Sequence, residues 1–397
     1  RMKLVFFKKK TKVYYRYKEK HMSIRRIIRN KKFRRFICCL SKLTDKRQKG
    51  KIKHPLESCL IIIILSELSG CNYFREFVLF GKRHESKLKK LGLLPNGLPS
   101  HDTLERMVQN VDKLELNKTL VALLFPSLKN RPIISIDGKC VRATKDSSVK
   151  GSYGGMKDIV TMFMRESKLS LLSYNNSDKG SEMNVIPVLL KMFHETYPNV
   201  KPYITIDAIG ITHEILTLLK QYEYDFVIGY KRRKETMNEL SKVLTESQGE
   251  TKDKAVNSSR IETRIFNLYS PGGIVGIEQW LPYISHVGKM NSKIEYMVTG
   301  EITKSEYYYF TSDISVNEFM KIRRHHWAIE NSLHWVLDNS FKEDRMRIKK
   351  GHASENMNLL RKFVLNVLAL TNCTTESVSA SRDELKYDTP QQLLYKI

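Results

Sequence analysis

Apolar residues in the first third of the chain recur at helical spacing. Leu60, Ile63, Ile64 and Leu68 share one face of a helix, and Gly70 then supplies a C-terminal stop. Two more helices are expected: one at about residues 73–80 and one that is capped by Ser100 or Asp102 and runs through Val108. We therefore predict a small helical domain over residues 45–128, for which DNA binding is one open role.

The middle of the chain changes to short apolar runs bounded by polar residues, which is typical of strands. The expected elements, in chain order, are strands at 133–137, 159–164 and 169–174, a helix at 183–193, a strand at 204–207, a helix at 213–221 and a strand at 224–228. This order is that of a ribonuclease-H-like core, in which three antiparallel strands are followed by strands added in parallel. The predicted fold class is α/β: a mixed sheet flanked by helices.

A polar stretch separates this core from the last helices. We predict a mostly-β insertion over residues 231–312, with short strands near 296–299 and 307–311. Two further helices would then complete a catalytic domain that spans residues 129–372: one at about 316–338 and one at about 354–370. The remaining residues, 373–397, are polar and are expected to form a peripheral tail.

Charge indicates a polyanionic partner. The chain of 397 residues has 69 Lys and Arg against 42 Asp and Glu, a net charge of +27. Residues 1–44 form a basic arm with interleaved aromatic residues, either a phosphate-binding arm or simply a solvated one. The most apolar run, 60–65, is too short to span a bilayer. Six cysteines without a CxxC pair fit a reducing cytoplasm, so we expect a cytoplasmic protein that binds no membrane.

Three carboxylates are the candidate chemistry. Asp137 and Asp207 each close an apolar strand, and Glu330 lies in a basic, aromatic helix far downstream. An Asp after a strand is more often a turn or capping residue, but two in these positions plus a helix carboxylate favour a shared site. Two hard cations about 3.5–4 Å apart, held by such oxygens, can drive phosphodiester cleavage. We predict that Asp137, Asp207 and Glu330 are catalytic and bind Mg2+, with Mn2+ as a substitute.

Histidines in the same helix offer a rival. His326, Glu330 and His334 recur every four residues, which also suits zinc, although the spacing is not that of an HExxH site. The favoured interpretation is that Arg323, His326 and His334 approach phosphate or orient the carboxylate. Two tryptophans of this helix are expected in the core rather than as stacking platforms for bases: Trp327 and Trp335.

The chain resembles the DDE transposases of the ISAs family, also known as H-repeat-associated proteins, within the IS-four-like group. The resemblance covers roughly residues 45–370. It rests on these motifs: His54-Pro55-Leu56, Leu98-Pro99-Ser100-His101-Asp102-Thr103, Ile136-Asp137-Gly138-Lys139, Lys179-Gly180-Ser181-Glu182-Met183, Thr205-Ile206-Asp207-Ala208, the block His326–Trp335, Phe341-Lys342-Glu343-Asp344, Arg347 and Glu355-Asn356.

The resemblance implies a ribonuclease-H-like fold with an insertion and a Mg2+-bound triad of Asp137, Asp207 and Glu330. It also implies cleavage at the ends of an insertion sequence and transfer of the freed 3′-hydroxyl into target DNA, with double-stranded DNA as partner and a homodimer as the working complex. Glu182 and Lys231 are secondary candidates by position. Basic residues near these motifs are the predicted DNA contacts: Lys139, Arg142, Arg232, Arg233, Arg324 and Arg347.

One departure from the family pattern keeps a second interpretation open. The family continues Lys-Gly-Asn-Gln after the fifth strand, whereas this chain has Lys231-Arg232-Arg233-Lys234. The alternative function is a transposase-derived protein that binds DNA and no longer cuts it. A ribonuclease-H-like nuclease of repair or defence is disfavoured by the specific motif block. The end sequence and target preference are not readable from the chain.

Overall fold

The computed structural model describes most of the chain after its first 29 residues. The described residues are 30–125, 128, 131–145, 148, 155–175, 182–208, 211–231, 244, 246–257, 259–326, 329–346, 348–371 and 377–397.

The N-terminal part is a bundle of helices around α3 (Leu56–Leu68), which is buried on all sides. Ser100 caps α6 (His101–Asn110), because its hydroxyl accepts a hydrogen bond from the Thr103 amide. The three helices expected here are confirmed. The other described helices of the bundle are α2 (Lys31–Ser41), α4 (Phe74–Arg83), α5 (Glu85–Lys90) and α7 (Lys113–Leu124), with a short 3-10 turn η1 (Lys49–Lys51).

The helix α2 differs from the expectation of an extended basic arm. Its residues Phe33, Phe36 and Leu40 are buried in the same core as α3, and Phe36 stacks on Phe363 of a C-terminal helix. The basic side chains of α2 lie on its other face. Residues 31–41 are thus part of the helical bundle, while the arm before residue 30 lies outside the described residues.

A nine-stranded mixed sheet forms the second part, in the order β3-β2-β1-β4-β5-β9-β8-β7-β6. β1 pairs antiparallel with β2, and β2 with β3, whereas β4 joins β1 and β5 joins β4 in parallel. The sequence predicted these five strands, their order in the chain and their directions. Their bounds are β1 (Ile133–Val141), β2 (Lys157–Met164), β3 (Leu169–Tyr174), β4 (Tyr203–Ile206) and β5 (Asp225–Tyr230).

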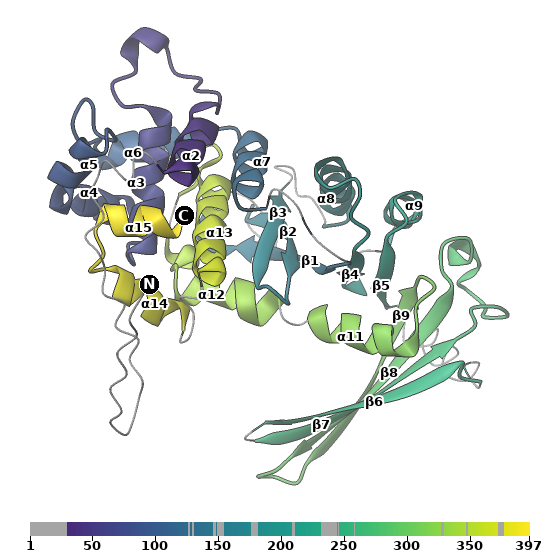
Figure 1. Cartoon of the computed structure of the whole chain (residues 1–397). Helices are drawn as coiled ribbons and strands as arrows, with labels where there is room; N and C mark the ends of the chain where they lie inside the picture. The colour runs from purple at the N-terminus through teal and green to yellow at the C-terminus, as the bar shows by residue number, and fades with distance from the viewer. Residues whose placement is uncertain are drawn as a thin grey trace, which may run out of the picture.

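Helices cover both faces of this sheet, so alternate strand residues point into different cores. α8 (Glu182–Thr196) and α9 (His213–Gln221) pack on one face, where Ile134 and Ile136 of β1 are buried. α11 (Val316–His326) crosses the other face and contacts β1 and β4 (Figure 1). Side chains of β1 at odd-numbered positions therefore point toward α11 and the helix that follows it.

The predicted insertion extends the sheet instead of forming a separate unit. β9 (Ile302–Thr311) pairs antiparallel with β5, and β8 (His286–Tyr296), β7 (Arg260–Tyr269) and β6 (Gly249–Asn257) follow in order. The strand expected at 296–299 is wrong, because β8 ends at Tyr296 and residues 297–299 turn into β9. The 3-10 turn η4 (Glu278–Trp280) lies between β7 and β8.

The C-terminal helices return to the N-terminal bundle. α13 (Ala353–Leu370) is buried along almost its whole length and packs on α3, α6, α7 and β3. α14 (Val378–Leu385) and α15 (Pro390–Lys396) pack against α3, and Arg382 is only 2% exposed. The expectation of a peripheral tail at 373–397 is therefore wrong for α14 and α15. Polar residues such as Arg382 are buried here because backbone carbonyls of the bundle accept their hydrogen bonds.

Among the described residues, no helix is both long and apolar enough to cross a membrane.

Candidate active site

Asp137 lies in the middle of β1, which continues four residues beyond the predicted end at 137, and Asp207 directly follows the neighbouring parallel strand β4. Ile136 of β1 is paired in register with Ile206 of β4, so Asp137 and Asp207 come next at the same level of the sheet. Neighbouring strands lie about 4.8 Å apart. Asp137 is partly buried, and its Oδ1 accepts a hydrogen bond of 3.0 Å from the Gly138 amide, while Asp207 is exposed. The two aspartates thus lie on neighbouring strands, at the level where the parallel pairing of β1 with β4 ends.

Gly229 of β5 makes room for Asp207. A Cβ atom added at Gly229 would lie 2.8 Å from the Ala208 amide nitrogen and 3.3 Å from Asp207 Oδ1. The backbone after β4 can therefore turn close to β5 only because position 229 lacks a side chain. Sequence reasoning missed this residue, and its signal was a glycine inside the apolar strand Asp225–Tyr230.

Glu330 begins a π-helical turn. The amide of Trp335 donates to the carbonyl of Glu330, five residues back, and the π turn Glu330–His334 (η5) continues directly into α12 (Trp335–Asn339). Such turns insert one extra residue into a helix and occur frequently at functional sites. One continuous helix was expected at 316–338, and the π turn is the departure from it. The Glu330 side chain is exposed and has no ion-pair partner among the described residues.

The helix that carries Glu330 is fixed to β1 on both sides of Asp137. The Ser135 hydroxyl donates to the His325 carbonyl at 3.3 Å, and Lys139 Nζ lies 2.6 Å from Asp338 Oδ1. Because residues 135, 137 and 139 of β1 point to the same face, Asp137 faces the helix between these two contacts. The segment from His325 to Asp338, which includes Glu330, therefore passes over the strand end.

His334 lies closest to Asp137 from this helix. Its Nδ1 is 3.7 Å from Asp137 Oδ2, which is longer than a hydrogen bond. Burial lowers the pKa of His334 to about 3, and the nearby Lys362 and Lys139 ammonium groups add to that shift. The imidazole is therefore neutral at pH 7, and the contact is not an ion pair despite its distance. His334 can orient the carboxylate but cannot neutralise it, nor can it attract phosphate through charge.

Asp207 has a different set of neighbours. Burial lowers the pKa of His326 to about 4, and Arg323 lowers it further, while Asp207 acts in the opposite direction. Arg323 is buried, and its Nε donates to the Tyr309 hydroxyl at 2.6 Å. Arg323 is thus turned toward Tyr309 in the sheet, and a neutral His326 can contact phosphate or a carboxylate only as a hydrogen-bonding group; that these two residues approach phosphate or orient the carboxylate stays a prediction.

Lys139 does not lie on a DNA-accessible surface, so that predicted DNA contact is wrong. Its side chain is only 9% exposed, and Nζ contacts Asp338 at 2.6 Å and Glu343 Oε2 at 2.9 Å. The two carboxylates saturate the ammonium group and leave no surface for phosphate. Lys139 instead ties β1 to α12 and to the following 3-10 turn η6 (Glu343–Arg345).

A buried ionic network continues from Lys139 into the helical bundle. Glu343 also lies 3.6 Å from Arg361, and Arg361 in turn lies 3.3 Å from Glu67 of α3. Burial alone would raise the pKa of Glu343, but Lys139 and Arg361 outweigh it and bring the pKa to about 2. Sequence reasoning missed Arg361, Glu67 and Glu343 as partners. Their signal was charge within otherwise apolar helices, as at Glu67 after the run Leu60–Leu65.

The three predicted carboxylates do not form a ready metal cage. Within the described part of the chain, no three His, Cys, Asp or Glu side chains are grouped closely enough to hold a metal ion. The zinc interpretation of His326, Glu330 and His334 is not supported, and the π turn disrupts their even spacing. The carboxylate oxygens that Asp137, Asp207 and Glu330 offer are nevertheless of the kind that a hard divalent ion prefers.

The remaining predicted residues are spread around the site. Arg142, directly after β1, is 81% exposed, Arg324 is 45% exposed and pairs with Asp253 of β6, and Lys231 is exposed at the end of β5. Glu182 is the first residue of α8, and its side chain is outside the described set. Trp335 is 59% exposed, so its expected place in the core is wrong. The predictions for Arg232, Arg233, Arg347 and Trp327 also lie outside the described residues.

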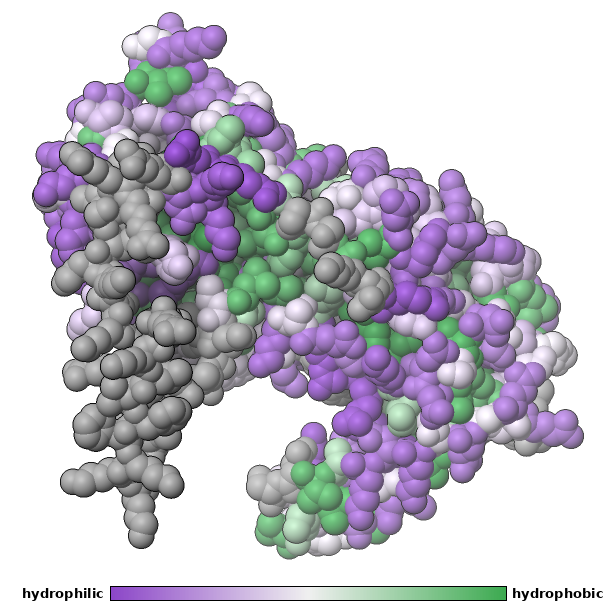
Figure 2. All heavy atoms as spheres, viewed as in Figure 1, coloured by the Kyte–Doolittle hydropathy of each residue, from purple (hydrophilic) through white to green (hydrophobic). Residues whose placement is uncertain are grey.

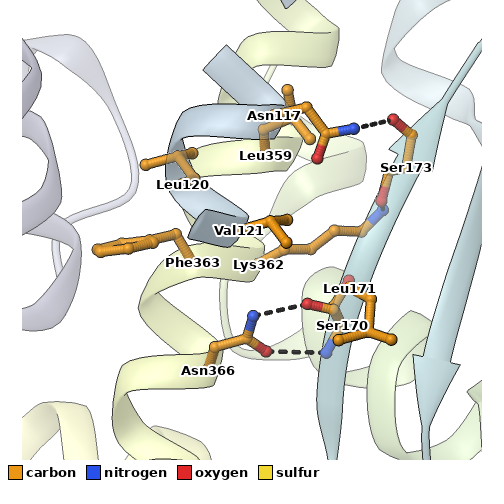
Figure 3. A pocket seen from close by; sticks show the side chains of 10 residues that line it. All are labelled: Asn117, Leu120, Val121, Ser170, Leu171, Ser173, Leu359, Lys362, Phe363 and Asn366. Atoms are coloured by element: carbon orange, nitrogen blue, oxygen red, sulfur yellow. Dashed lines mark hydrogen bonds between the residues drawn. The ribbon is translucent and has the colours of Figure 1, made fainter. Parts of the chain in front are cut away.

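A small cavity lies behind the site, between α7, β3 and α13 (Figure 3). Its volume is about 10 Å³, so it holds at most one water molecule and no substrate. Lys362 reaches along it, and its Nζ contacts the hydroxyls of Thr161 at 2.6 Å and Ser173 at 2.9 Å. Thr161 is the cross-strand partner of Asp137, so this buried lysine lies one strand away from the candidate site.

Two family models together match most of the chain. The family model described as Transposase DDE domain matches residues 128–367, and a second one, described as DDE_Tnp_1-associated, matches residues 37–124. The chain therefore belongs to the Transposase DDE domain family.

Relatives extend over most of the chain. YncI of Escherichia coli O157:H7, a candidate transposase, is 29% identical over 384 residues, which cover 88% of this chain and 95% of YncI. The H repeat-associated protein YhhI of Escherichia coli K12 is 26% identical over 353 residues, covering 83% of this chain and 89% of YhhI. Among solved structures, a piggyBac transposase synaptic complex with hairpin DNA aligns with a TM-score of 0.42 and 13% identity, covering 91% of this chain and 78% of that one.

Proposed function

We propose that this chain is a metal-dependent transposase of the ISAs, or H-repeat-associated, group, with a ribonuclease-H-like catalytic domain. It would cleave DNA at insertion-sequence ends and join the freed 3′ end to target DNA. The observation that carries the proposal is the register of β1 and β4, in which Asp137 and Asp207 are neighbours below the helix of Glu330. The family match supports the same assignment.

The proposed metal ligands are Asp137, Asp207 and Glu330. Their oxygens are the hard donors that Mg2+ prefers, and Mn2+ is the expected substitute. A divalent cation bound there would supply an activated hydroxyl nucleophile and stabilise the leaving oxygen of the phosphodiester. His334 is neutral and lies 3.7 Å from Asp137 Oδ2, so it restrains that carboxylate without cancelling its charge. Glu330 is exposed, and it would supply the third carboxylate to a cation held by the two aspartates.

Basic groups around the strand ends are the proposed DNA contacts. Arg142, Lys231 and Arg324 have exposed side chains beside the site. Arg232, Arg233 and Arg347 remain predicted contacts from the sequence, and Glu182 remains a secondary candidate. A transposase joins two element ends, so we further propose that two copies act together as a homodimer on double-stranded DNA.

The test is cleavage of a duplex that carries the flanking element end by the purified full chain. Cleavage with Mg2+ or Mn2+, and none with EDTA, is the expected result. Glu330→Gln is expected to lower the rate on the order of 1000-fold, because metal stabilisation supplies several kcal/mol at about 1.4 kcal/mol per factor of ten. Glu195→Gln is the matched control, since Glu195 is 66% exposed and lies on α8, a helix that carries none of the three proposed metal ligands.

Two results would count against the proposal. Cleavage that persists at the wild-type rate in Glu330→Gln would remove Glu330 from the triad. Specific binding of the element end with no cleavage under any divalent metal would identify the alternative, a transposase-derived DNA-binding protein. Methyl-resonance or circular-dichroism spectra of each variant show whether it keeps the wild-type fold.

A further inference from the structure

Strands β6–β9 form an arm that projects past the edge of the sheet where the two aspartates lie. β5 pairs with β9 only through residues 227–230 and 308–311, so residues 302–307 of β9 continue beyond the carboxyl end of β5. At about 3.4 Å per residue, this part of the arm is about 20 Å long. Figure 1 shows the four strands leaving the sheet as one twisted blade.

The arm has an inner and an outer face, which strand register separates. α11 covers the inner face, where Phe319 packs edge-on against Phe266 and Arg324 pairs with Asp253. Alternate residues of each strand belong to the opposite, outer face. The outer face of the projecting part has no helix packed on it among the described elements.

A row of lysines crosses this outer face. Register places Lys254 opposite Thr263, Thr263 opposite Lys293, and Lys293 opposite Lys304, so the row spans β6 to β9 over about 14 Å. The three lysines are exposed; Lys293 pairs with Glu295 at 3.4 Å, and Glu306 lies two residues from Lys304 on the same face, where it pairs with Lys289. Like charges directly opposite one another destabilise a sheet. Lys293 and Lys304 therefore repel each other across β8 and β9, and an external anion bound between them would relieve this repulsion.

The tip of the arm is apolar. Val298 is 88% exposed, Met297 58%, Val256 63% and Ile302 49%. The Met297 amide donates to the Ser259 carbonyl at 2.9 Å, which ties the two turns of the tip together. Figure 2 shows this apolar surface at the end of the arm, bordered by hydrophilic surface. Exposed apolar groups at the end of a protruding element mark a contact surface.

The lysine row and the tip are spaced to suit one ligand. The row lies two residues behind the Val256–Ile302 level of the tip, or about 7 Å. The minor groove of duplex DNA is about 7.5 Å deep, and apolar side chains of minor-groove-binding proteins insert between base steps there. Lysines set back by this depth would reach the phosphates that border the groove. A protein partner would account for the tip but not for the row.

We propose that the arm is a second DNA-binding surface, in which Lys254, Lys293 and Lys304 contact phosphates and the β8–β9 turn, with Met297 and Val298, enters the minor groove. The inference rests on the proposed function, because DNA is the partner proposed for the arm. It adds a contact that is separate from the carboxylates, on the face of the sheet opposite α11.

The test compares the triple variant Lys254→Gln/Lys293→Gln/Lys304→Gln with a control that removes equal charge elsewhere, Lys118→Gln/Lys191→Gln/Lys201→Gln. The control lysines lie on α7, on α8 and before β4. Binding of a labelled duplex is measured by fluorescence anisotropy in EDTA over a range of salt concentrations. The slope of log affinity on log salt is expected to fall by about 2 to 3 in the triple variant, because each lost phosphate contact removes about 0.9. The control is expected to keep the wild-type slope.

A stability measurement separates this effect from damage to the fold. The triple variant removes the opposed Lys293–Lys304 pair, so its thermal midpoint is expected to equal or exceed that of the wild type. If the triple variant fails to fold, the single variant Lys304→Gln is measured instead, and its slope of log affinity on log salt is expected to fall by about 1. Met297→Ser/Val298→Ser is expected to reduce DNA bending, measured by end-to-end energy transfer, while it keeps the salt slope.

The outcomes distinguish this inference from the proposed function. Wild-type cleavage together with an unchanged salt slope in the folded triple variant would overturn the arm as a DNA surface and leave the transposase assignment intact. A reduced slope without any cleavage would support the arm and overturn the catalytic proposal. Dissociation of a dimer by Met297→Ser/Val298→Ser, with no change in DNA bending, would show that the tip binds a second copy of the chain instead.

Discussion

Two local effects shape the surroundings of Asp137 and Asp207: the room that neighbouring side chains leave for the backbone, and the desolvation of nearby histidines. Gly229 leaves room for the backbone of Asp207 and Ala208, and burial keeps His326 and His334 uncharged beside the two aspartates. Lys139 and Lys362 are also buried, and their ammonium groups donate hydrogen bonds to Asp338 and to Thr161. The charged state of these side chains is therefore set by their surroundings in the fold.

Gly229→Ala is expected to displace Asp207. The new Cβ atom would lie 2.8 Å from the Ala208 amide nitrogen, so the backbone after β4 must shift. Overpacking of this kind costs about 1–3 kcal/mol, and a displacement of about 1 Å at a catalytic group lowers the rate on the order of 100-fold. Urea denaturation and the Mg2+-dependent cleavage rate measure the two effects. Gly272→Ala is the control, since its nearest neighbour would be 3.8 Å away, and an equal loss in both variants would contradict the argument.

Lys362→Met is expected to stabilise the protein at pH 7. Burial lowers the pKa of Lys362 to about 7 from an unfolded value near 10.5, so between these pH values the unfolded chain binds more protons and wild-type stability rises with pH. The variant lacks this dependence. Thr161 and Ser173 still contact each other at 3.3 Å after the substitution, so a gain of about 2 kcal/mol is expected at pH 7. Urea denaturation should show a smaller stability gain for the variant at pH 10 than at pH 7. An equal difference in the free energy of unfolding at both pH values would refute the prediction.

At the scale of elements, the helical segment that crosses the sheet is fixed to β1 by two contacts, and a π turn lies between those contacts. α11 is tied to β1 through Ser135 and His325, and α12 is tied to the same strand through Lys139 and Asp338. The π turn Glu330–His334 adds one residue between these anchors and rotates the helix that follows. His334 therefore lies 3.7 Å from Asp137 in a register that an unbroken helix would not provide.

The helix α14 is an integral part of the bundle, and a substitution of Arg382 tests this conclusion. Its guanidinium donates to the carbonyls of Glu67, Cys71 and Ser340. Arg382→Ala leaves these buried carbonyls without a donor, at about 1–3 kcal/mol each for groups that water does not reach. We expect a loss of about 3 kcal/mol in the free energy of unfolding. Lys386→Ala at the exposed end of the same helix is the comparison, and an effect as large as that of Arg382→Ala would show that α14 as a whole was disturbed.

On the scale of the whole molecule, three parts meet at the carboxyl ends of the parallel strands. The helical bundle is joined to the site by the network Glu67–Arg361–Glu343–Lys139. The sheet presents the aspartates, and the β-arm extends about 20 Å beyond them. α13 belongs to both the bundle and the sheet, so the N-terminal helices cannot move independently of β3. This arrangement holds separate basic surfaces at fixed distances from the proposed reaction centre.

The sequence by itself determined the order of elements and the two strand-end aspartates. Alternating and helical periodicities are local, and so the strands β1–β5 and the helices α8 and α9 followed from runs of a few residues. Asp137 and Asp207 were predictable as neighbours, because consecutive crossovers bring the ends of parallel strands to one edge. The charge of +27 likewise indicated a polyanionic partner without reference to any contact.

Only the tertiary structure decided which charged residues are free to act. Lys139 and Arg323 look like phosphate contacts in the sequence, but long-range partners, Glu343 and Tyr309, hold them inside the fold. The register of the β-arm, which aligns three lysines from three separate strands, depends on pairings that no local pattern specifies. Residues distant in the chain set desolvation and pairing, so the protonation of His334 and the role of each basic side chain became readable only from the folded protein.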